Sequence, residues 1–93
     1  MEIQHDDNGK KGSFYMEQDG ERVAEMTHTW AGESMFIIDH TEVSEKLKGQ
    51  GAGKKLVEAS VAFARKLNVK ILPLCPFAKN VFDKSPEYDD LWR

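Results

Sequence analysis

A glycine-rich stretch in the middle of the chain has the residue types of an anion-binding loop. Residues 48–53 read Lys-Gly-Gln-Gly-Ala-Gly, and Lys54 and Lys55 follow at once. Glycines let a backbone turn tightly and let several amide N–H groups point toward one ligand. A helix that begins at this point adds unpaired amide donors and the positive end of its dipole. The stretch therefore predicts a cradle for a pyrophosphate.

The spacing of the glycines disfavours two common nucleotide-binding motifs. The dinucleotide fingerprint Gly-x-Gly-x-x-Gly fails because Gly49 and Gly51 are followed by Lys54. The phosphate loop of nucleoside triphosphatases needs a glycine where Lys48 stands, and it needs a hydroxyl where Lys55 stands. Neither a nicotinamide coenzyme nor a nucleoside triphosphate is the expected ligand.

The sequence predicts strands before the loop and mainly helices after it, and these elements would position the loop. Before it, alternating polar and apolar residues predict strands at 1–4, 13–18, 21–30 and 34–43, with turns at 6–9, 19–20 and near Gly32. After it, the patterns predict a helix over 51–67, a strand over 69–74, a helix from Pro76 to about Lys84, and another helix after Ser85. The expected fold class is α+β. It has a mixed sheet, with an antiparallel meander followed by a β-α-β crossover and short C-terminal helices.

The strand before the loop ends in a polar segment. Residues 36–38 are apolar, and residues 39–42 are all polar. Strict alternation places Ile38, His40 and Glu42 on one face, and it places Thr41 and Val43 on the other together with Ile37 and Asp39. Ligands of open sheets bind beyond the carboxyl ends of the strands. We therefore expect these polar groups to lie near a site.

The loop and its flanks resemble the acyl-CoA loop of the GNAT superfamily of N-acetyltransferases, which reads Arg/Gln-x-x-Gly-x-Gly/Ala. Lys48, Gly51 and Gly53 take the three defined places, while Val43 precedes and Leu56 follows as in the family. Together with residues 40–43 and the Cys-Pro-Phe of residues 75–77, the chain resembles very small stand-alone GNAT-like proteins. It departs from the usual pattern in having Lys48 for Arg or Gln, Glu45 for Pro, and Ala52 for a larger apolar residue.

The resemblance implies one N-acetyltransferase domain over residues 1–93, with acetyl-CoA as cofactor and an unidentified amine as acceptor. The residues that it assigns to acetyl-CoA are Thr41, Val43, Lys48, Gly49, Gln50, Gly51, Ala52, Gly53, Lys54, Phe77 and Asn80. The end of the polar strand would offer backbone groups to the pantetheine arm, and Glu42 or His40 would deprotonate the amine. The structural alternative is a solvated Glu42 and a His40 that makes an ordinary hydrogen bond.

Cys75 is the third candidate catalytic residue. Pro73 and Pro76 end a strand and begin a helix, so the thiol is expected at a helix N-terminus, where the dipole favours a thiolate. GNAT enzymes commonly have Asn-x-x-Ala-x-x-x-Tyr here, and the tyrosine protonates the departing CoA sulfur. Cys75 and Phe82 take the first and last places, and Phe82 has no hydroxyl.

Several roles for Cys75 remain open at this stage. It can act as a nucleophile or as a proton donor, Tyr88 can supply a phenol in its place, or Cys75 can be a buried small hydrophobe. A thiol redox or acyl-carrier role for Cys75 alone is a weaker possibility. If the acid is lost altogether, the chain is a non-catalytic CoA or acyl-CoA-binding regulatory module.

Composition narrows the partners further. The chain has 93 residues, of which 40% are hydrophobic and 31% charged, as expected for one compact domain. A net charge of −3 argues against general binding to nucleic acid or to an anionic membrane. No stretch approaches the ~20 apolar residues of a membrane span, and the single cysteine suits a reducing compartment such as the cytoplasm. The sequence predicts no metal site and leaves monomer and homodimer open.

Overall fold

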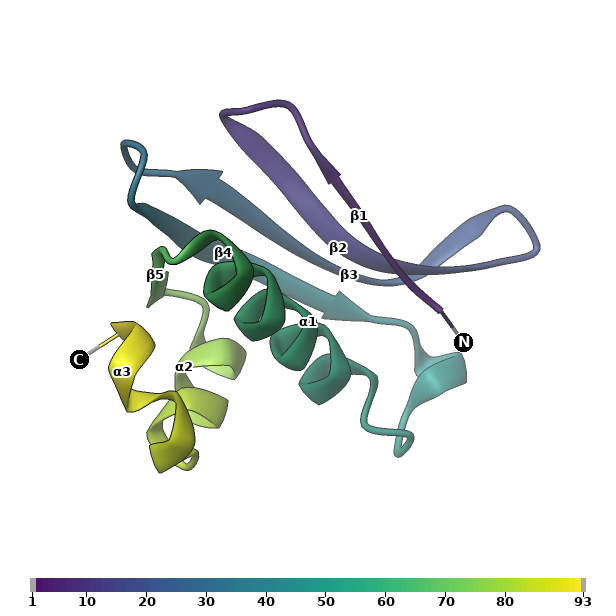
Figure 1. Cartoon of the computed structure of the whole chain (residues 1–93). Coiled ribbons are helices and arrows are strands. Elements are labelled where there is room, and N and C mark those ends of the chain that lie inside the picture. The colour runs from purple at the N-terminus through teal and green to yellow at the C-terminus, as the bar shows by residue number, and fades with distance from the viewer. Residues whose placement is uncertain (1, 93) are drawn as a thin grey trace.

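Tight turns join the first four strands of the sheet into an antiparallel meander (Figure 1). The structure, a computed structural model, describes residues 2–92. Its strands are β1 (Ile3–Asp7), β2 (Lys11–Gln18), β3 (Glu21–Trp30), β4 (Met35–Val43) and β5 (Lys70–Pro73), in the order β1-β2-β3-β4-β5. At the β2–β3 turn, Asp19 and Gly20 both have positive φ angles, as the tightest hairpin turns require.

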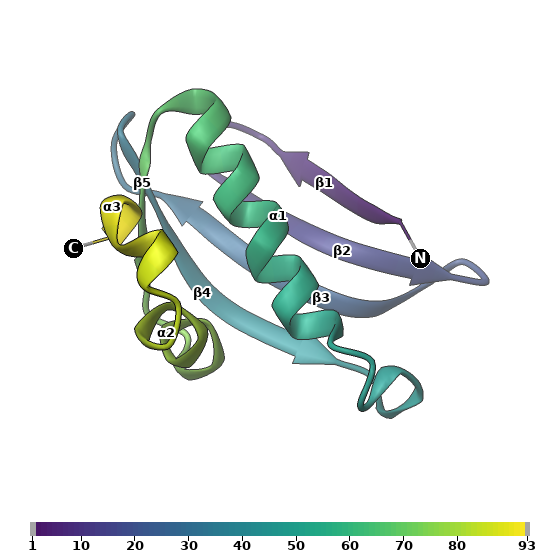
Figure 2. The same ribbon diagram turned by 60° about the horizontal axis from the view of Figure 1, so that its bottom comes forward.

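The main helix crosses one face of this sheet. Helix α1 (Ala52–Leu67) presents an apolar stripe to the strands, in which Leu56, Val57, Val61 and Ala64 are buried. β5 then runs parallel to β4, so β4, α1 and β5 form the expected crossover. Figure 2 shows α1 lying obliquely across the sheet.

Short helices complete the same side of the sheet (Figure 1). They are α2 (Pro76–Asp83), α3 (Asp89–Trp92) and two 3₁₀ turns, η1 (Glu45–Leu47) and η2 (Pro86–Tyr88). No described helix covers the opposite face, which we call the outer face. None of the described helices combines the length and the apolar composition needed to cross a lipid bilayer. The expected α+β architecture with a mixed sheet is confirmed.

The first strand differs from its prediction. The sequence placed a strand at residues 1–4 and a turn at 6–9, whereas β1 runs from Ile3 to Asp7; Met1 lies outside the described residues. Asp6 belongs to the strand because its carboxylate accepts hydrogen bonds from the Ser13 backbone N–H and from the Ser13 hydroxyl, both at 2.9 Å. The local turn pattern could not reveal these partners on β2.

A β-bulge at Asp39 overturns the predicted facing of β4. His28 pairs with Ile38, but the preceding Thr27 pairs with His40, so Asp39 is an extra residue in β4. Beyond the bulge, Thr41 pairs with the buried Met26 on the helix side of the sheet. The prediction that Ile38, His40 and Glu42 share a face was wrong.

Hydrogen bonds from β3 hold the bulged residue. The hydroxyl of Thr29 donates to the Asp39 carboxylate at 2.7 Å, and the hydroxyl of Thr27 donates to its other oxygen. Threonines two apart on one strand project to one face, and here both project to the outer face. Asp39 is therefore drawn outward, which allows the next residues to change their facing.

Strand β4 extends well beyond its neighbour β5. Pairing ends at Ile38 and Pro73, where the Ile38 carbonyl accepts from both Leu74 N–H (3.1 Å) and Cys75 N–H (3.0 Å). Residues 39–43 of β4 have no β5 partner. The two strands therefore separate at this point and leave one backbone edge of β4 open for a ligand.

The bulge yields a prediction about acid stability. Partial burial raises the pKa of the Asp39 carboxyl, but hydrogen bonds from Thr27 and Thr29 outweigh this effect and hold the pKa below its usual value. A depressed folded-state pKa stabilises the protein above the unfolded pKa, and this contribution is lost as the pH falls through the folded-state pKa. We expect Asp39→Asn to lower the free energy of unfolding by about 1 kcal/mol near neutral pH.

Urea unfolding across the acid range provides the test. The difference in unfolding free energy between wild type and Asp39→Asn should shrink below about pH 4, the ordinary carboxyl pKa. Substitution of an exposed carboxylate, Glu17→Gln, is the matched control. A difference that stays constant down to the lowest pH would show that the carboxylate does not hold the bulge.

Candidate functional site

The glycine loop leads into α1 with a set of backbone donors free of helical partners. Gly49 and Gly51 have φ angles of 81° and 70°, values that favour glycine. Gly51 caps the helix without a side chain, and its carbonyl accepts the first helical hydrogen bond from Lys55 N–H at 3.0 Å. The amides of residues 52–54 precede that bond. Unpaired amides at the positive end of a helix dipole are groups that can bind an anion.

Helix α2 packs closely against this first turn. A Cβ atom at Gly53 would lie 2.5 Å from Cζ of Phe77, so only glycine allows the ring to lie in its present position. The Phe77 side chain nevertheless remains 41% exposed. Its ring therefore forms a wall beside the loop as well as a contact with the helix.

Between the loop and Phe77 lies a hollow of about 410 Å³, which we call the loop hollow. Its lining residues are Val43, Leu47, Lys48, Gly49, Gly51, Ala52, Gly53, Lys54, Phe77 and Val81. Its lining is mostly apolar, and its charged residues are Lys48 and Lys54. The apolar arm of a ligand would fit this lining, with an anionic end near the lysines.

Cys75 lies beside the loop hollow, where β4 and β5 separate. It caps α2, is 5% exposed, and donates its S–H to the Thr41 hydroxyl at 3.2 Å. The bulge makes this contact possible because it places Thr41 on the helix side. Val43 and Phe77, each two residues farther along its own element, line the hollow. The thiol therefore lies near the hollow without lining it.

His40 and Glu42 lie on the outer face, away from Cys75. They are exposed and pair with Thr27 and Glu25 of β3. Glu42 lines a second hollow of about 420 Å³, which we call the outer hollow. Its lining residues are Arg22, Val23, Ala24, Glu25, Glu42, Val43, Ser44 and Glu45. Val43 belongs to both hollows, so the two adjoin at the end of β4.

Most residues expected to bind acetyl-CoA line the loop hollow, and three do not. Thr41 instead accepts the hydrogen bond from Cys75 beside the hollow. Gln50 lines an adjoining hollow of about 50 Å³, which shares Leu47 and Ala52 with the loop hollow, and its side-chain amide is 3.5 Å from the Lys46 carbonyl. Asn80 is exposed on α2 and lines none of the hollows described above. The sequence analysis missed Leu47 and Val81; the helical spacing of Val81 four residues after Phe77 was an available signal.

Neither tyrosine of the chain reaches the loop hollow. Tyr88 packs against Phe82 in the core with ring centroids 5.5 Å apart. Burial raises the pKa of the Tyr88 phenol, and the Glu58 and Glu87 carboxylates raise it further. Tyr15 lies under the Arg22 guanidinium, 3.7 Å from its ring centroid. Among the described residues, no tyrosine hydroxyl therefore replaces the one that Phe82 lacks.

The chain is similar to known acetyltransferases in sequence and in structure. Residues 13–91 match the family described as GCN5-related N-acetyl-transferase. The NMR solution structure of a GCN5-like protein from Staphylococcus aureus has 39% sequence identity and a TM-score of 0.76. That similarity covers 99% of this chain and 87% of the other. No curated protein matches the chain in sequence.

More distant structures share the fold alone. A ribosomal-protein-alanine N-acetyltransferase from Brucella melitensis has 16% identity and a TM-score of 0.68, over 83% of this chain and 62% of the other. An aminoglycoside acetyltransferase from an uncultured soil sample has 17% identity and a TM-score of 0.61, over 88% and 59%. Because the family match spans most of its length and the Staphylococcus aureus protein matches almost all of it, the chain belongs to the GCN5-related N-acetyltransferase family.

Proposed function

We propose that this chain binds acetyl-CoA in the loop hollow and transfers the acetyl group to an amine that arrives from the outer face. One observation carries the proposal: the gap between β4 and β5 has the Cys75–Thr41 hydrogen bond on its helix side and Glu42 and His40 on its outer side. A thioester placed along the open edge of β4 would be reached from both sides. The gap thus joins two sets of groups that the sheet otherwise separates.

The loop hollow supplies the binding groups. The amides of residues 52–54 would receive the pyrophosphate, and Lys48 and Lys54 would add positive charge beside it. Val43, Phe77 and Val81 would cover the apolar part of the pantetheine arm. The open backbone edge of β4 would form hydrogen bonds with the amide groups of that arm, as another strand does.

The chemistry follows from the two sides of the gap. Acetyl-CoA supplies an activated thioester. Glu42 or His40 takes a proton from the amine as the nitrogen–carbon bond forms and the carbon–sulfur bond breaks. Cys75 gives its S–H proton to the departing sulfur and is reprotonated from solvent. This direct route assigns Cys75 the role of acid, because the candidate bases lie across the sheet from it and cannot activate it as a nucleophile.

The outer hollow indicates the class of acceptor. Glu25, Glu42 and Glu45 line it together with one cation, Arg22, whose guanidinium pairs with Glu25 and also with Asp6 at 2.9 Å. The excess of carboxylates favours an acceptor that carries positive charge. We propose a polycationic amine, such as a diamine or a lysine-rich peptide, and a cytoplasmic location, where reducing conditions keep the single thiol free.

A non-catalytic CoA-binding module is the second candidate. The observation in its favour is Phe82, which is fully buried against Tyr88 and Trp92 where the family commonly places a tyrosine. This alternative keeps the loop hollow and assigns Cys75 a packing role.

If Cys75 is the general acid, its removal should slow acetyl transfer without weakening acetyl-CoA binding. We expect Cys75→Ala to lower kcat for acetyl transfer by about a hundredfold, the usual contribution of a general acid. The Kd for acetyl-CoA measured by calorimetry should change by no more than about twofold, since the acid acts on the transition state. Cys75→Ser, which keeps a donor for Thr41, controls for packing.

Intact-protein mass spectrometry without an acceptor distinguishes the alternatives. The acid role predicts no stable acetyl group on Cys75. A label that hydroxylamine removes, and that Cys75→Ala lacks, would instead establish a covalent route. Tight binding of acetyl-CoA with no turnover of any amine would favour the binding module, and absence of binding would overturn both proposals.

If the start of α1 binds the pyrophosphate, removing a lysine charge there should weaken acetyl-CoA binding more than removing one at the end of the helix. We expect Lys54→Gln, in the first turn of α1, to weaken acetyl-CoA binding by about twofold to fivefold at low salt. Lys66→Gln, in the last turn of the same helix, should leave binding unchanged. Calorimetric titration at two salt concentrations measures both, and equal effects of the two substitutions would rule out a cradle at the helix N-terminus.

The acidic outer hollow predicts a preference among acceptors. We expect 1,4-diaminobutane to be acetylated with a higher kcat/KM than 4-aminobutanol by about fivefold, a typical effect of one favourable charge interaction. Glu45→Gln should narrow this ratio without changing acetyl-CoA binding. The rate of CoA thiol release measures both acceptors, and an equal kcat/KM for the two would exclude acceptor selection by charge.

A further inference from the structure

A glycine on β2 creates a gap in the helix-facing side of the sheet, far from the loop hollow. Asp7 of β1 pairs with Gly12 of β2, and Gly12 pairs with His28 of β3, so these three residues form one row. A Cβ atom at Gly12 would lie 2.2 Å from the Asp6 carbonyl oxygen and 2.8 Å from Nε2 of His28. The missing side chain leaves room for groups from β1 and β3 to meet.

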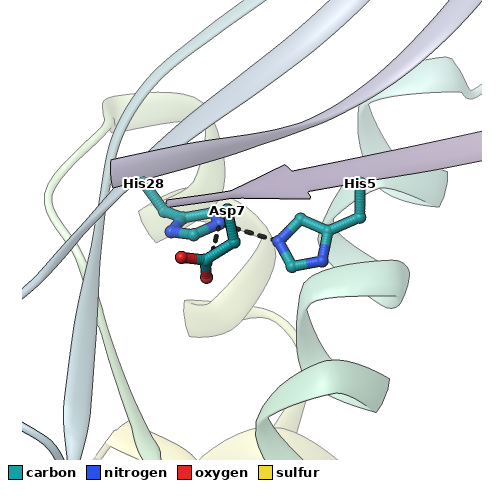
Figure 3. Close-up of side chains that lie close together, drawn as sticks. All are labelled: His5, Asp7 and His28. Carbon is teal, nitrogen blue, oxygen red and sulfur yellow. Dashed lines mark hydrogen bonds and ion pairs between the residues drawn. The ribbon is translucent and has the colours of Figure 1, made fainter. Parts of the chain in front are cut away.

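Three side chains with metal-binding atoms converge over this gap (Figure 3). His5, two residues before Asp7 on β1, points to the same side. Nε2 of His5 lies 2.9 Å from Nε2 of His28, and His28 Nε2 lies 4.0 Å from the Asp7 carboxylate. One ligand atom from each of the three residues lies within 4.8 Å of the others.

Neighbouring groups fix the orientation of two of these side chains. The His5 ring stacks on Phe14 with a centroid distance of 4.0 Å and an interplanar angle of 3°. The Asp7 carboxylate accepts from Trp30 Nε1 at 2.8 Å and from Gly9 N–H at 2.7 Å. Outer partners that orient ligand side chains in this way are typical of metal sites.

The buried ring of His28 lacks a partner at one nitrogen. His28 is 1% exposed, and its Nδ1 has no hydrogen-bond partner among the described residues. Burial lowers the pKa of His28, and His5 lowers it further; burial also lowers the pKa of His5, despite the opposing effect of Asp7. A cation would need the lone pairs of both Nε2 atoms, so it would displace the proton that one of them carries in the 2.9 Å contact between the two rings.

We propose that His5 Nε2, His28 Nε2 and the Asp7 carboxylate bind a divalent transition metal ion of the zinc type. Two imidazoles and one carboxylate suit zinc and cobalt, whereas calcium and magnesium prefer oxygen ligands throughout. Metal–nitrogen bonds of about 2.0–2.1 Å at a tetrahedral angle separate two nitrogens by about 3.3 Å. The two rings are thus within a few tenths of an ångström of the required separation.

The site has three protein ligands and would keep a fourth position open. Asp7 also lines a hollow of about 440 Å³ together with Trp30, Phe63 and Leu67, so this position would face water or a small ligand. Phe63 lies ten residues after Gly53 on α1, or about 15 Å along the helix. The metal site is therefore separate from the loop hollow, and it would fasten the edge strand β1 to β3.

Titration of the purified full chain with Co²⁺ and Zn²⁺ tests the proposal. Wild type should bind one ion per chain, show the visible absorption of nitrogen-ligated cobalt, and melt at a higher temperature with Zn²⁺. His5→Phe keeps an aromatic ring on Phe14, so it should fold and lose the cobalt spectrum. Asp7→Asn keeps an acceptor for Trp30 and should weaken the affinity by at least about tenfold.

The third histidine of the chain provides the matched control. His40 lies on the outer face, so His40→Ala should bind cobalt as wild type does. Loss of binding in His40→Ala, no binding by wild type, or unchanged binding in both His5→Phe and Asp7→Asn would overturn the proposal. Acetyl-CoA binding by His5→Phe should equal that of wild type, which keeps this test independent of the proposed function.

Discussion

The hydrogen bonds between Asp39 and the two threonines of β3 determine how the candidate site is arranged. They hold an extra residue in β4, and that residue turns Thr41 and Val43 toward α1 while His40 and Glu42 turn outward. Without it, Thr41 would face away from Cys75, and the base candidates would lie under the helix. One exposed carboxylate therefore decides which groups can meet at the gap between β4 and β5.

Two glycines, Gly53 and Gly12, allow close packing at opposite ends of the molecule because they lack a Cβ atom. At Gly53 the missing Cβ lets Phe77 lie against the first turn of α1, and at Gly12 it lets His28 and Asp7 approach each other. In each case the space is filled by a functional candidate from another element. Gly53 lies in the first turn of α1, and Phe63 and Leu67 near its other end line the hollow beside Asp7, so one helix forms a wall of both regions.

Local patterns made part of the structure predictable. The glycine loop and the start of α1 depend on contiguous residues, which explains why the sequence predicted a helix from residue 51 and the structure begins it at Ala52. The side of the sheet to which Thr41 points could not be predicted, because the bulge depends on threonines that lie on another strand. The sequence predicted a strand that ended before His5 and a turn that included Asp7, and the relation of both residues to His28 depends on pairing with β2. Long-range register, rather than propensity, was the missing information.

The separation of β4 from β5 has a consequence for how the cofactor and the acceptor would enter and leave the proposed site. Under the proposed function, a cofactor on the helix side and an acceptor on the outer side would reach one point through different openings. Neither would need to leave before the other enters, so this architecture would impose no compulsory order of binding or release. It also lets an acceptor much larger than the protein itself present a single amine at the outer face, with the rest of its bulk remaining in solvent.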